Sequence, residues 1–179
     1  MIETARLRLR LVDEHDAAAT VRLLTPEVSR WLASWPSPLD EGAAAARLRQ
    51  LREVADKGHG LPLAIERLHG GTMIGLVMIM RSRTDARRGG LGYWLGEPYH
   101  RQGYMLEAAR AAVAHAFLRL NLDAIEAGAQ PTNEASLAIM RRLGMRPIGE
   151  RPVWAEARDR EETCAYYEIT RHEHAARRG

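Results

Sequence analysis

A turn of six residues, HRQGYM at positions 100–105, has the make-up of an anion-binding site. It joins a predicted strand at 92–95 to a long amphipathic helix that ends near Leu120. Gly103 permits a tight turn, and the start of the helix presents backbone N–H groups that have no partner inside the helix. These groups, together with the helix dipole, favour a phosphate. A strand–turn–helix unit of ordinary packing fits the same residues, so the turn alone does not decide between the two.

A second polar cluster lies further along the chain. Asn133 stands where a shorter helix, residues 133–143, begins, and asparagine is an ordinary cap at such a position. Ser136 lies in the first turn of that helix, on the same inward side as Ile139 and Met140. Its hydroxyl can act on a bound ligand or simply satisfy the end of the helix. Both interpretations stay open for both residues.

The elements that position these residues predict one domain with a mixed sheet and helices on its faces. An alternating strand at 6–11 opens the chain, and helices broken near a Thr-Pro pair occupy 13–33. Asp40 is a good N-cap for a helix that runs to about residue 57. Gly75 marks a bulge or a close approach of another backbone. Further strands are predicted at 61–67, 72–81, 92–95, 124–129, 145–157 and 162–170.

Composition is that of an ordinary globular protein. Charged residues make up 27% of the 179 and the net charge is +3, with arginine as 25 of the 26 basic residues; this indicates a solvated surface rather than a nucleic-acid site. The single cysteine, Cys164, excludes an internal disulfide, and the histidines lack ligand spacing, so we expect no metal. With no signal peptide and no apolar run of about 20 residues, we expect a cytoplasmic protein without a membrane partner. Residues 172–179 are expected to form a basic, flexible tail.

Four segments, in this order, carry a resemblance to a known family: RLRLR near the start, GYWL, HRQGYMLEA and NEASLAIMRRLGM. They resemble the GCN5-related N-acetyltransferases (GNAT), and most of all the branch that acetylates the N-terminal amine of ribosomal proteins. The resemblance extends over about residues 4–170. It implies a single N-acetyltransferase domain at 1–171 with an α/β fold: a central, mostly antiparallel twisted sheet, splayed at the cofactor site, with helices on both faces. It also implies acetyl-coenzyme A as cosubstrate.

The family's pyrophosphate loop has Arg or Gln first, Gly fourth and Gly or Ala sixth, and it falls on residues 100–105. Gly103 matches, whereas His100 replaces the usual first residue and Met105 the usual last one. Backbone N–H groups make most of the phosphate contacts in this family, so the changed side chains need not remove the site. By resemblance, the cofactor-binding residues are Trp94, Leu95, His100, Arg101, Gln102, Gly103, Tyr104, Met105, Asn133 and Ser136.

The chemistry that the resemblance implies is direct attack of a neutral amine on the thioester. A backbone N–H in the stretch 94–96 would stabilise the oxyanion, and Ser136 would donate a proton to the departing thiolate. The proton acceptor is left open between Glu97, which follows that strand, and the tyrosines of the last strand, Tyr166 and Tyr167, of which one must face the dry side. We name Ser136, Glu97 and Tyr167 as the catalytic candidates.

The acceptor is the least defined part of this interpretation. In the ribosomal-protein branch a carboxylate stands where an ungapped match puts Ala155 here. Trp31, Trp35 and Trp154 fall where the fold implies an acceptor cleft, although a place in the core is the more common outcome for tryptophan. We expect transfer to a protein or peptide N-terminal amine, by a monomer or a homodimer. The alternatives are a small amine such as an antibiotic or polyamine, a non-catalytic acyl-coenzyme A sensor, and a nucleic-acid-binding protein.

Overall fold

Eight strands form one continuous sheet in the part of the chain, residues 1–177, that this computed structural model describes. Their order is β1-β2-β3-β4-β5-β6-β8-β7. Neighbouring strands are antiparallel except for β5 and β6, which are parallel. The strands are β1 (Ile2–Glu3), β2 (Leu7–Leu11), β3 (Gly60–Arg67), β4 (Met73–Arg81), β5 (Arg88–Leu95), β6 (Ala124–Ala129), β7 (Arg146–Ala155) and β8 (Arg160–Thr170).

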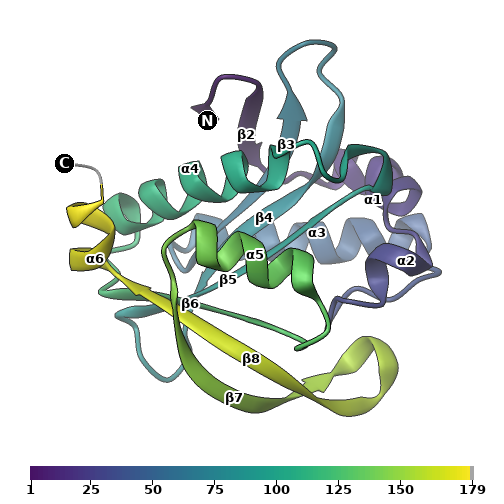
Figure 1. Cartoon of the computed structure of the whole chain (residues 1–179). Coiled ribbons are helices and arrows are strands. Elements are labelled where there is room, and N and C mark those ends of the chain that lie inside the picture. Colours follow the sequence, from purple (N-terminus) through teal and green to yellow (C-terminus); the bar gives the residue numbers. More distant parts are fainter. Residues whose placement is uncertain (178–179) are drawn as a thin grey trace.

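Helices cover both faces of this sheet (Figure 1). α4 and α5 lie side by side on the near face, and α3 lies behind the sheet. The core is accordingly divided into two clusters, one between α4 and the sheet and one beneath α1 and α3. The fold class expected from the sequence is thus confirmed. The helices are α1 (Ala17–Leu23), α2 (Pro26–Ser29), α3 (Glu41–Asp56), α4 (Tyr104–Arg119), α5 (Glu134–Arg142) and α6 (Arg171–Ala176), with 3-10 turns η1 (Glu14–Asp16), η2 (Glu97–Tyr99) and η3 (Glu156–Arg158).

The local sequence explains where the two long helices lie. Asp40 caps α3, since its carboxylate accepts the Ala43 N–H at 2.9 Å, as predicted. The apolar stripe predicted for the helix after the HRQGYM turn is also confirmed, because every member is buried in α4 or at its end. Most of these side chains are alanine, which lets the helix approach the sheet closely. The stripe consists of Met105, Ala109, Ala112, Ala116 and Leu120.

The end of the chain differs from the expected flexible tail. Thr170 and Glu173 form a reciprocal capping box, in which the Thr170 hydroxyl and the Glu173 carboxylate each satisfy a backbone N–H of the other residue. This cap starts α6, so the prediction of a flexible segment from residue 172 was wrong over the length of this helix. The basic composition hid a local signal, the T-x-x-E pattern. The last part of the expected tail, residues 178–179, lies outside the described residues.

None of the helices among residues 1–177 combines the length and the apolar character needed to cross a membrane. In the same part of the chain, no three His, Cys, Asp or Glu side chains are grouped so that they could hold a metal ion.

β5 and β6 are joined only at one end. Their parallel pairing covers Arg88 to Gly90 of β5, opposite Ala124 to Glu126 of β6. Beyond these pairs, β5 stays with β4 as far as Leu95, and β6 stays with β8 to its end. The two neighbours therefore separate, and within residues 1–177 no strand pairs with their facing edges in the gap.

Glycines in β4 and β5 bear on two predictions made from the sequence. A Cβ at Gly75 would lie 2.2 Å from the Trp94 carbonyl oxygen, so the predicted close approach of another backbone is confirmed. The polar segment before residue 92 was expected to be a loop, but β5 starts at Arg88. That expectation was wrong because Gly89 and Gly90 carry no side chains to show the alternation of a strand.

Candidate active site

The gap between β5 and β6 opens into a cavity of about 760 Å³. Its walls come from both separated strands, from the HRQGYM turn, from the first turns of α5, and from the segment that follows α2. The far side is closed by the β7–β8 hairpin, which contributes Val153, Glu162, Cys164 and Tyr166. The cavity therefore passes through the sheet, from the α4 and α5 side to the α2 side.

In the HRQGYM turn, the residue directly before α4 has a left-handed backbone conformation, and the start of α4 lies in the cavity wall. Gly103 has φ +78°, and Arg101 also has a positive φ, +59°. The first hydrogen bond into the helix runs from the Glu107 N–H to the Gly103 carbonyl oxygen, at 3.1 Å. The N–H groups of the three residues between them precede this bond and have no acceptor among the described residues. Free N–H groups at a helix start favour an anion, and the anion-binding role of this turn stays a prediction.

Side chains of the turn hold its backbone in this shape. His100 Nε2 lies 2.8 Å from the Leu95 carbonyl oxygen, where a ring N–H donates, and Gln102 donates its amide N–H to the Pro98 carbonyl oxygen at 2.8 Å. His100 thus anchors the turn to the end of β5, and Gln102 anchors it to η2. Gln102 does not line the cavity, whereas His100 also does. Met105 is buried in the core, at 6% exposed, and it also contributes to the cavity wall.

Arg6 also holds the HRQGYM turn in place, and the sequence analysis did not identify this role. Its guanidinium donates to the Gln102 carbonyl oxygen at 3.0 Å, pairs with Glu107 at 2.7 Å, and lies over the Tyr104 ring at 4.5 Å from the centroid. Only the tertiary fold brings β2 beside the turn, so no local pattern near Arg6 could have indicated this role.

Asn133 and Ser136 meet on the α5 wall of the cavity. The Asn133 side chain accepts the Ser136 N–H at 3.2 Å, so it caps the helix, and both residues line the cavity. The Ser136 hydroxyl is 2.8 Å from the hydroxyl of Tyr93, which also lies 3.2 Å from the Ser136 carbonyl oxygen. Burial raises the pKa of Tyr93 to about 12, so the phenol keeps its proton at neutral pH. Tyr93 belongs to the GYWL segment but was not among the predicted site residues.

The opposite wall is aromatic. Trp31 and Trp35 line the cavity, and the Trp35 ring meets that of Trp94 edge-on at 6.1 Å. Trp35 is nevertheless 2% exposed, so it serves the core as well. Trp154 is 60% exposed and is not among the lining residues. Two of the three predicted tryptophans therefore face the cleft, and the third faces solvent.

Two carboxylates line this side of the cavity, Glu126 of β6 and Glu162 of β8. Glu162 accepts hydrogen bonds from Arg158, Arg160 and Gln130, and these hold its pKa down to about 2. A hydrogen bond from Arg151, at 2.9 Å, is the largest cause that lowers the pKa of Glu126. Both carboxylates are ionised at neutral pH.

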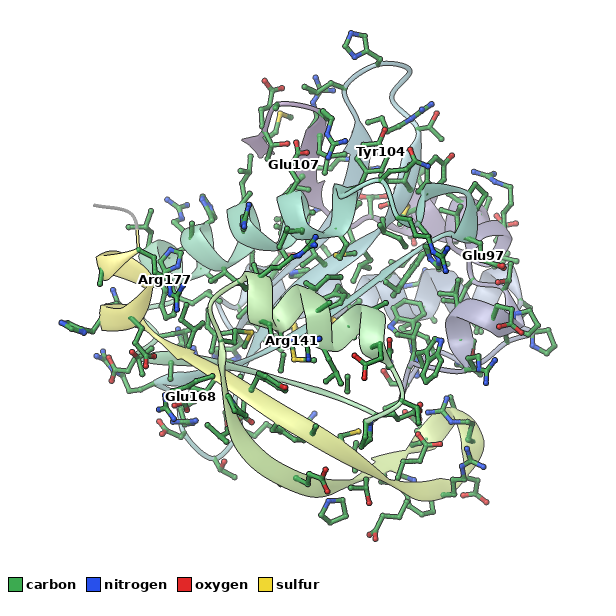
Figure 2. The ribbon with its side chains drawn as sticks, viewed as in Figure 1. Glu97, Tyr104, Glu107, Arg141, Glu168 and Arg177 are labelled. Carbon is green, nitrogen blue, oxygen red and sulfur yellow. The ribbon has the colours of Figure 1, made fainter. Side chains whose placement is uncertain are left out.

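The structure does not bring the other two catalytic candidates into the cavity. Glu97 is exposed on η2, where it accepts a hydrogen bond from Thr25, and Figure 2 shows it at the outer rim of the molecule. Tyr167 packs against the core on the α4 side, because side chains alternate along β8. Its neighbour Tyr166 faces the other way and lines the cavity, beside Gly128. Glu97 was chosen because it is close in sequence to the end of β5, which does not place it in the cavity. Which of the two tyrosines of β8 faces the cavity could not be predicted before the register of that strand was known.

Comparisons with known proteins agree with this geometry. The acetyltransferase (GNAT) domain family matches residues 6–146. A Bacillus subtilis protein named "Putative ribosomal N-acetyltransferase YdaF" is 24% identical over 150 residues, which cover 80% of each chain.

Solved structures are similar over nearly the whole chain. One, titled "putative ribosomal-protein-serine acetyltransferase" from Vibrio cholerae, is 25% identical, with a TM-score of 0.78 over 94% of this chain and 96% of that one. Another, Mycobacterium smegmatis RimJ in complex with a coenzyme A disulfide, is also 25% identical, with a TM-score of 0.79 over 94% and 87%. With a domain match that spans most of its length, the chain belongs to the GNAT family and is an acetyl-coenzyme A-dependent acyltransferase.

Proposed function

We propose that this enzyme acetylates the N-terminal amine of a protein or peptide, with the acyl donor between β5 and β6 and the acceptor on the α2 side. The observation that carries the proposal is a cavity that joins the free N–H groups at the start of α4 to a wall with two tryptophans and two carboxylates. The names of YdaF and of the Vibrio cholerae structure, which both refer to ribosomal proteins, support this class of acceptor.

The residues present fit the donor. A diphosphate matches the free N–H groups at the start of α4, and a narrow amide-bearing arm matches the unpaired strand edges of the gap. Coenzyme A supplies the activated thioester when bound. In this proposal Asn133 contacts the arm, and a backbone N–H within 94–96 stabilises the oxyanion.

Ser136 is proposed to protonate the departing thiolate. Its hydroxyl is already 2.8 Å from that of Tyr93, whose raised pKa keeps it a donor. A proton given up by Ser136 can therefore be replaced from Tyr93 along the existing hydrogen bond. The two hydroxyls act as one general acid, in which Ser136 donates to the thiolate and Tyr93 donates to Ser136.

The carboxylates of the acceptor side would attract the acceptor as an ammonium ion. Glu162 is too weak a base to remove a proton, because three donors hold its pKa near 2. Glu126 lines the cavity close to where β5 and β6 part, since its Cα pairs with that of Gly90. We assign proton removal to a water molecule beside Glu126, which passes the proton of the ammonium on to bulk solvent, in place of the exposed Glu97.

The test is a comparison of acceptors at saturating acetyl-coenzyme A. Purified protein is assayed against peptides with a free α-amine, the same peptides with a blocked N-terminus, aminoglycosides, polyamines and amino acids. Acetylation of the free peptides but not of the blocked ones is expected. Turnover of small amines alone would contradict the proposed acceptor. Tight cofactor binding without turnover of any amine would favour the acyl-coenzyme A sensor instead.

A further inference from the structure

A second groove, of about 830 Å³, adjoins the cavity at the N-terminus of α4. The two hollows share Gly103, Leu106 and Arg142 in their walls. From Gly103 the groove follows one face of α4, through Glu107 and Arg110, towards the end of α5 and α6. Figure 2 shows Glu107 near the start of α4 and Arg177 beyond its other end.

This groove is strongly basic. Among the described residues that line it, four are arginines, and the one carboxylate, that of Glu107, is already bound by Arg6 and Thr4. Arg110 and Arg142 are exposed and have no carboxylate within 4 Å in the described part of the chain. Arg110 donates to the Arg142 carbonyl oxygen at 3.3 Å, so the two residues lie together. This bond holds the Arg110 guanidinium against the backbone of Arg142, and both arginines line the groove without a carboxylate partner among residues 1–177, so an anion in the groove would be stabilised by both charges.

If a ligand places its diphosphate at the start of α4, the spacing puts these arginines within reach of a further phosphate on that ligand. Arg110 follows Gly103 by seven residues, which is about 10 Å along the helix axis. Its side chain leans back towards the N-terminus of α4, as helical side chains do. A phosphate that is one sugar away from a diphosphate at the start of α4 would lie in this interval.

We propose that this arginine groove, through Arg110 and Arg142, binds the 3′-phosphate at the nucleotide end of coenzyme A. The protein thereby distinguishes coenzyme A from its 3′-dephospho form. The inference rests on the proposed position of the donor, since it requires the diphosphate to lie at the start of α4. Guanidinium groups suit this role because they bind phosphate through two N–H groups at once.

The experiment is calorimetric titration of the full chain with coenzyme A and with dephospho-coenzyme A, which measures binding rather than turnover. The parent should bind coenzyme A about ten-fold or more tightly than the dephospho form, and this preference should shrink as salt is added. The double variant Arg110→Gln/Arg142→Gln should bind both ligands with the affinity that the parent has for dephospho-coenzyme A. Arg119→Gln, which removes one positive charge from an exposed site in the last turn of α4 and so matches each single substitution, should leave the preference intact.

Three results would overturn the inference. They are equal binding of the two ligands by the parent, an unchanged preference in the double variant, and an equal loss of affinity for both ligands in that variant. Failure of the parent to bind either ligand would contradict the proposed donor site as well, so the two failures are distinguishable. Both substituted residues are exposed, and a circular dichroism spectrum like that of the parent checks the fold; if it differs, Arg110→Gln alone should still reduce the preference.

Discussion

Gly103 has a backbone conformation that few other residues adopt, with φ +78° at the start of α4. We predict that Gly103→Val weakens the binding of coenzyme A by at least about ten-fold, because a β-branched residue in this region costs about 1–3 kcal/mol and would tilt the N–H groups away from the diphosphate. Calorimetric titration measures the loss.

Gly103→Asn is the matched control for that substitution. Asparagine tolerates the left-handed conformation, and a Cβ at this position meets nothing closer than the Arg6 guanidinium at 3.4 Å. It should therefore bind more tightly than the valine variant. If valine bound the cofactor as well as glycine does, the turn would not be the diphosphate site.

The hydrogen bond between Ser136 and Tyr93 makes a prediction about the rate. Ser136→Ala should lower kcat about ten-fold or more with little change in cofactor affinity, if protonation of the thiolate limits the rate. Tyr93→Phe should lower kcat in the same direction, and the double variant should be no slower than the slower single one, because the two hydroxyls act as a unit.

Tyr167→Phe controls for the general effect of removing a tyrosine hydroxyl from this region, since Tyr167 faces the core. Its kcat should stay within two-fold of the parent value. Strictly additive losses in Ser136→Ala and Tyr93→Phe would show that the residues act separately. An unchanged kcat in Ser136→Ala would remove Ser136 from the mechanism.

At the scale of elements, Arg158 ties the β7–β8 hairpin to the segment after α2. Its guanidinium donates to the carbonyl oxygens of Ser29 and Leu32 at 3.1 and 2.9 Å and pairs with Glu162 at 2.7 Å. Arg158→Met should lower the free energy of unfolding by about 2 kcal/mol, because two partly buried carbonyl oxygens lose their donor and Glu162 keeps only Arg160 and Gln130. Arg160→Met should cost less than about 0.5 kcal/mol, since Arg160 is exposed and does not reach α2. Chemical denaturation at pH 7 compares the two variants.

The ion pair between Arg158 and Glu162 makes the free energy of unfolding depend on pH in a predictable direction. The pKa of Glu162 is lowered to about 2 in the folded protein, below the usual value of 4.5. The stabilising effect of Glu162 is therefore complete at pH values above 4.5 and disappears as the pH falls towards 2. The difference in stability between the parent and Arg158→Met should therefore narrow between pH 5 and pH 2. A constant difference would mean that the two carbonyl contacts, and not Glu162, account for the loss.

Elements also show what the sequence could and could not predict. The amphipathic spacing of α4, the caps of α3 and α5 and the turn at Gly103 are encoded locally, and they were predicted at nearly the right residues. The partners that complete the site come from distant elements. Arg6 reaches the turn from the residue just before β2, and Tyr93 of β5 reaches Ser136 of α5. Which side β8 turns to the cavity depends on a register that tertiary packing sets, and this is why Tyr167 was chosen over Tyr166.

At the scale of the whole molecule, the sheet is in effect two halves. One half ends at β5 and the other starts at β6, and three residue pairs join them. α4 and α5 pack across this junction on one face, together with the larger core cluster. A ligand in the gap would pair with the edges of both strands. Its binding free energy should therefore stabilise the packing of the two halves against each other.

We therefore predict that coenzyme A stabilises the protein globally while protecting the gap locally. At a ligand concentration of 100 times Kd the gain is about 2.7 kcal/mol, which for a chain of this size raises Tm by about 5–10 °C. Hydrogen exchange should slow most at residues 91–95 of β5 and 127–129 of β6, because their facing edges lack a strand partner. The outer strands β1 and β7 should change little. In Gly103→Val at the same ligand concentration both effects should be reduced together, since they depend on one binding event. Protection spread evenly over the sheet, or a rise in Tm with no added protection in the gap, would mean that coenzyme A binds elsewhere on the molecule.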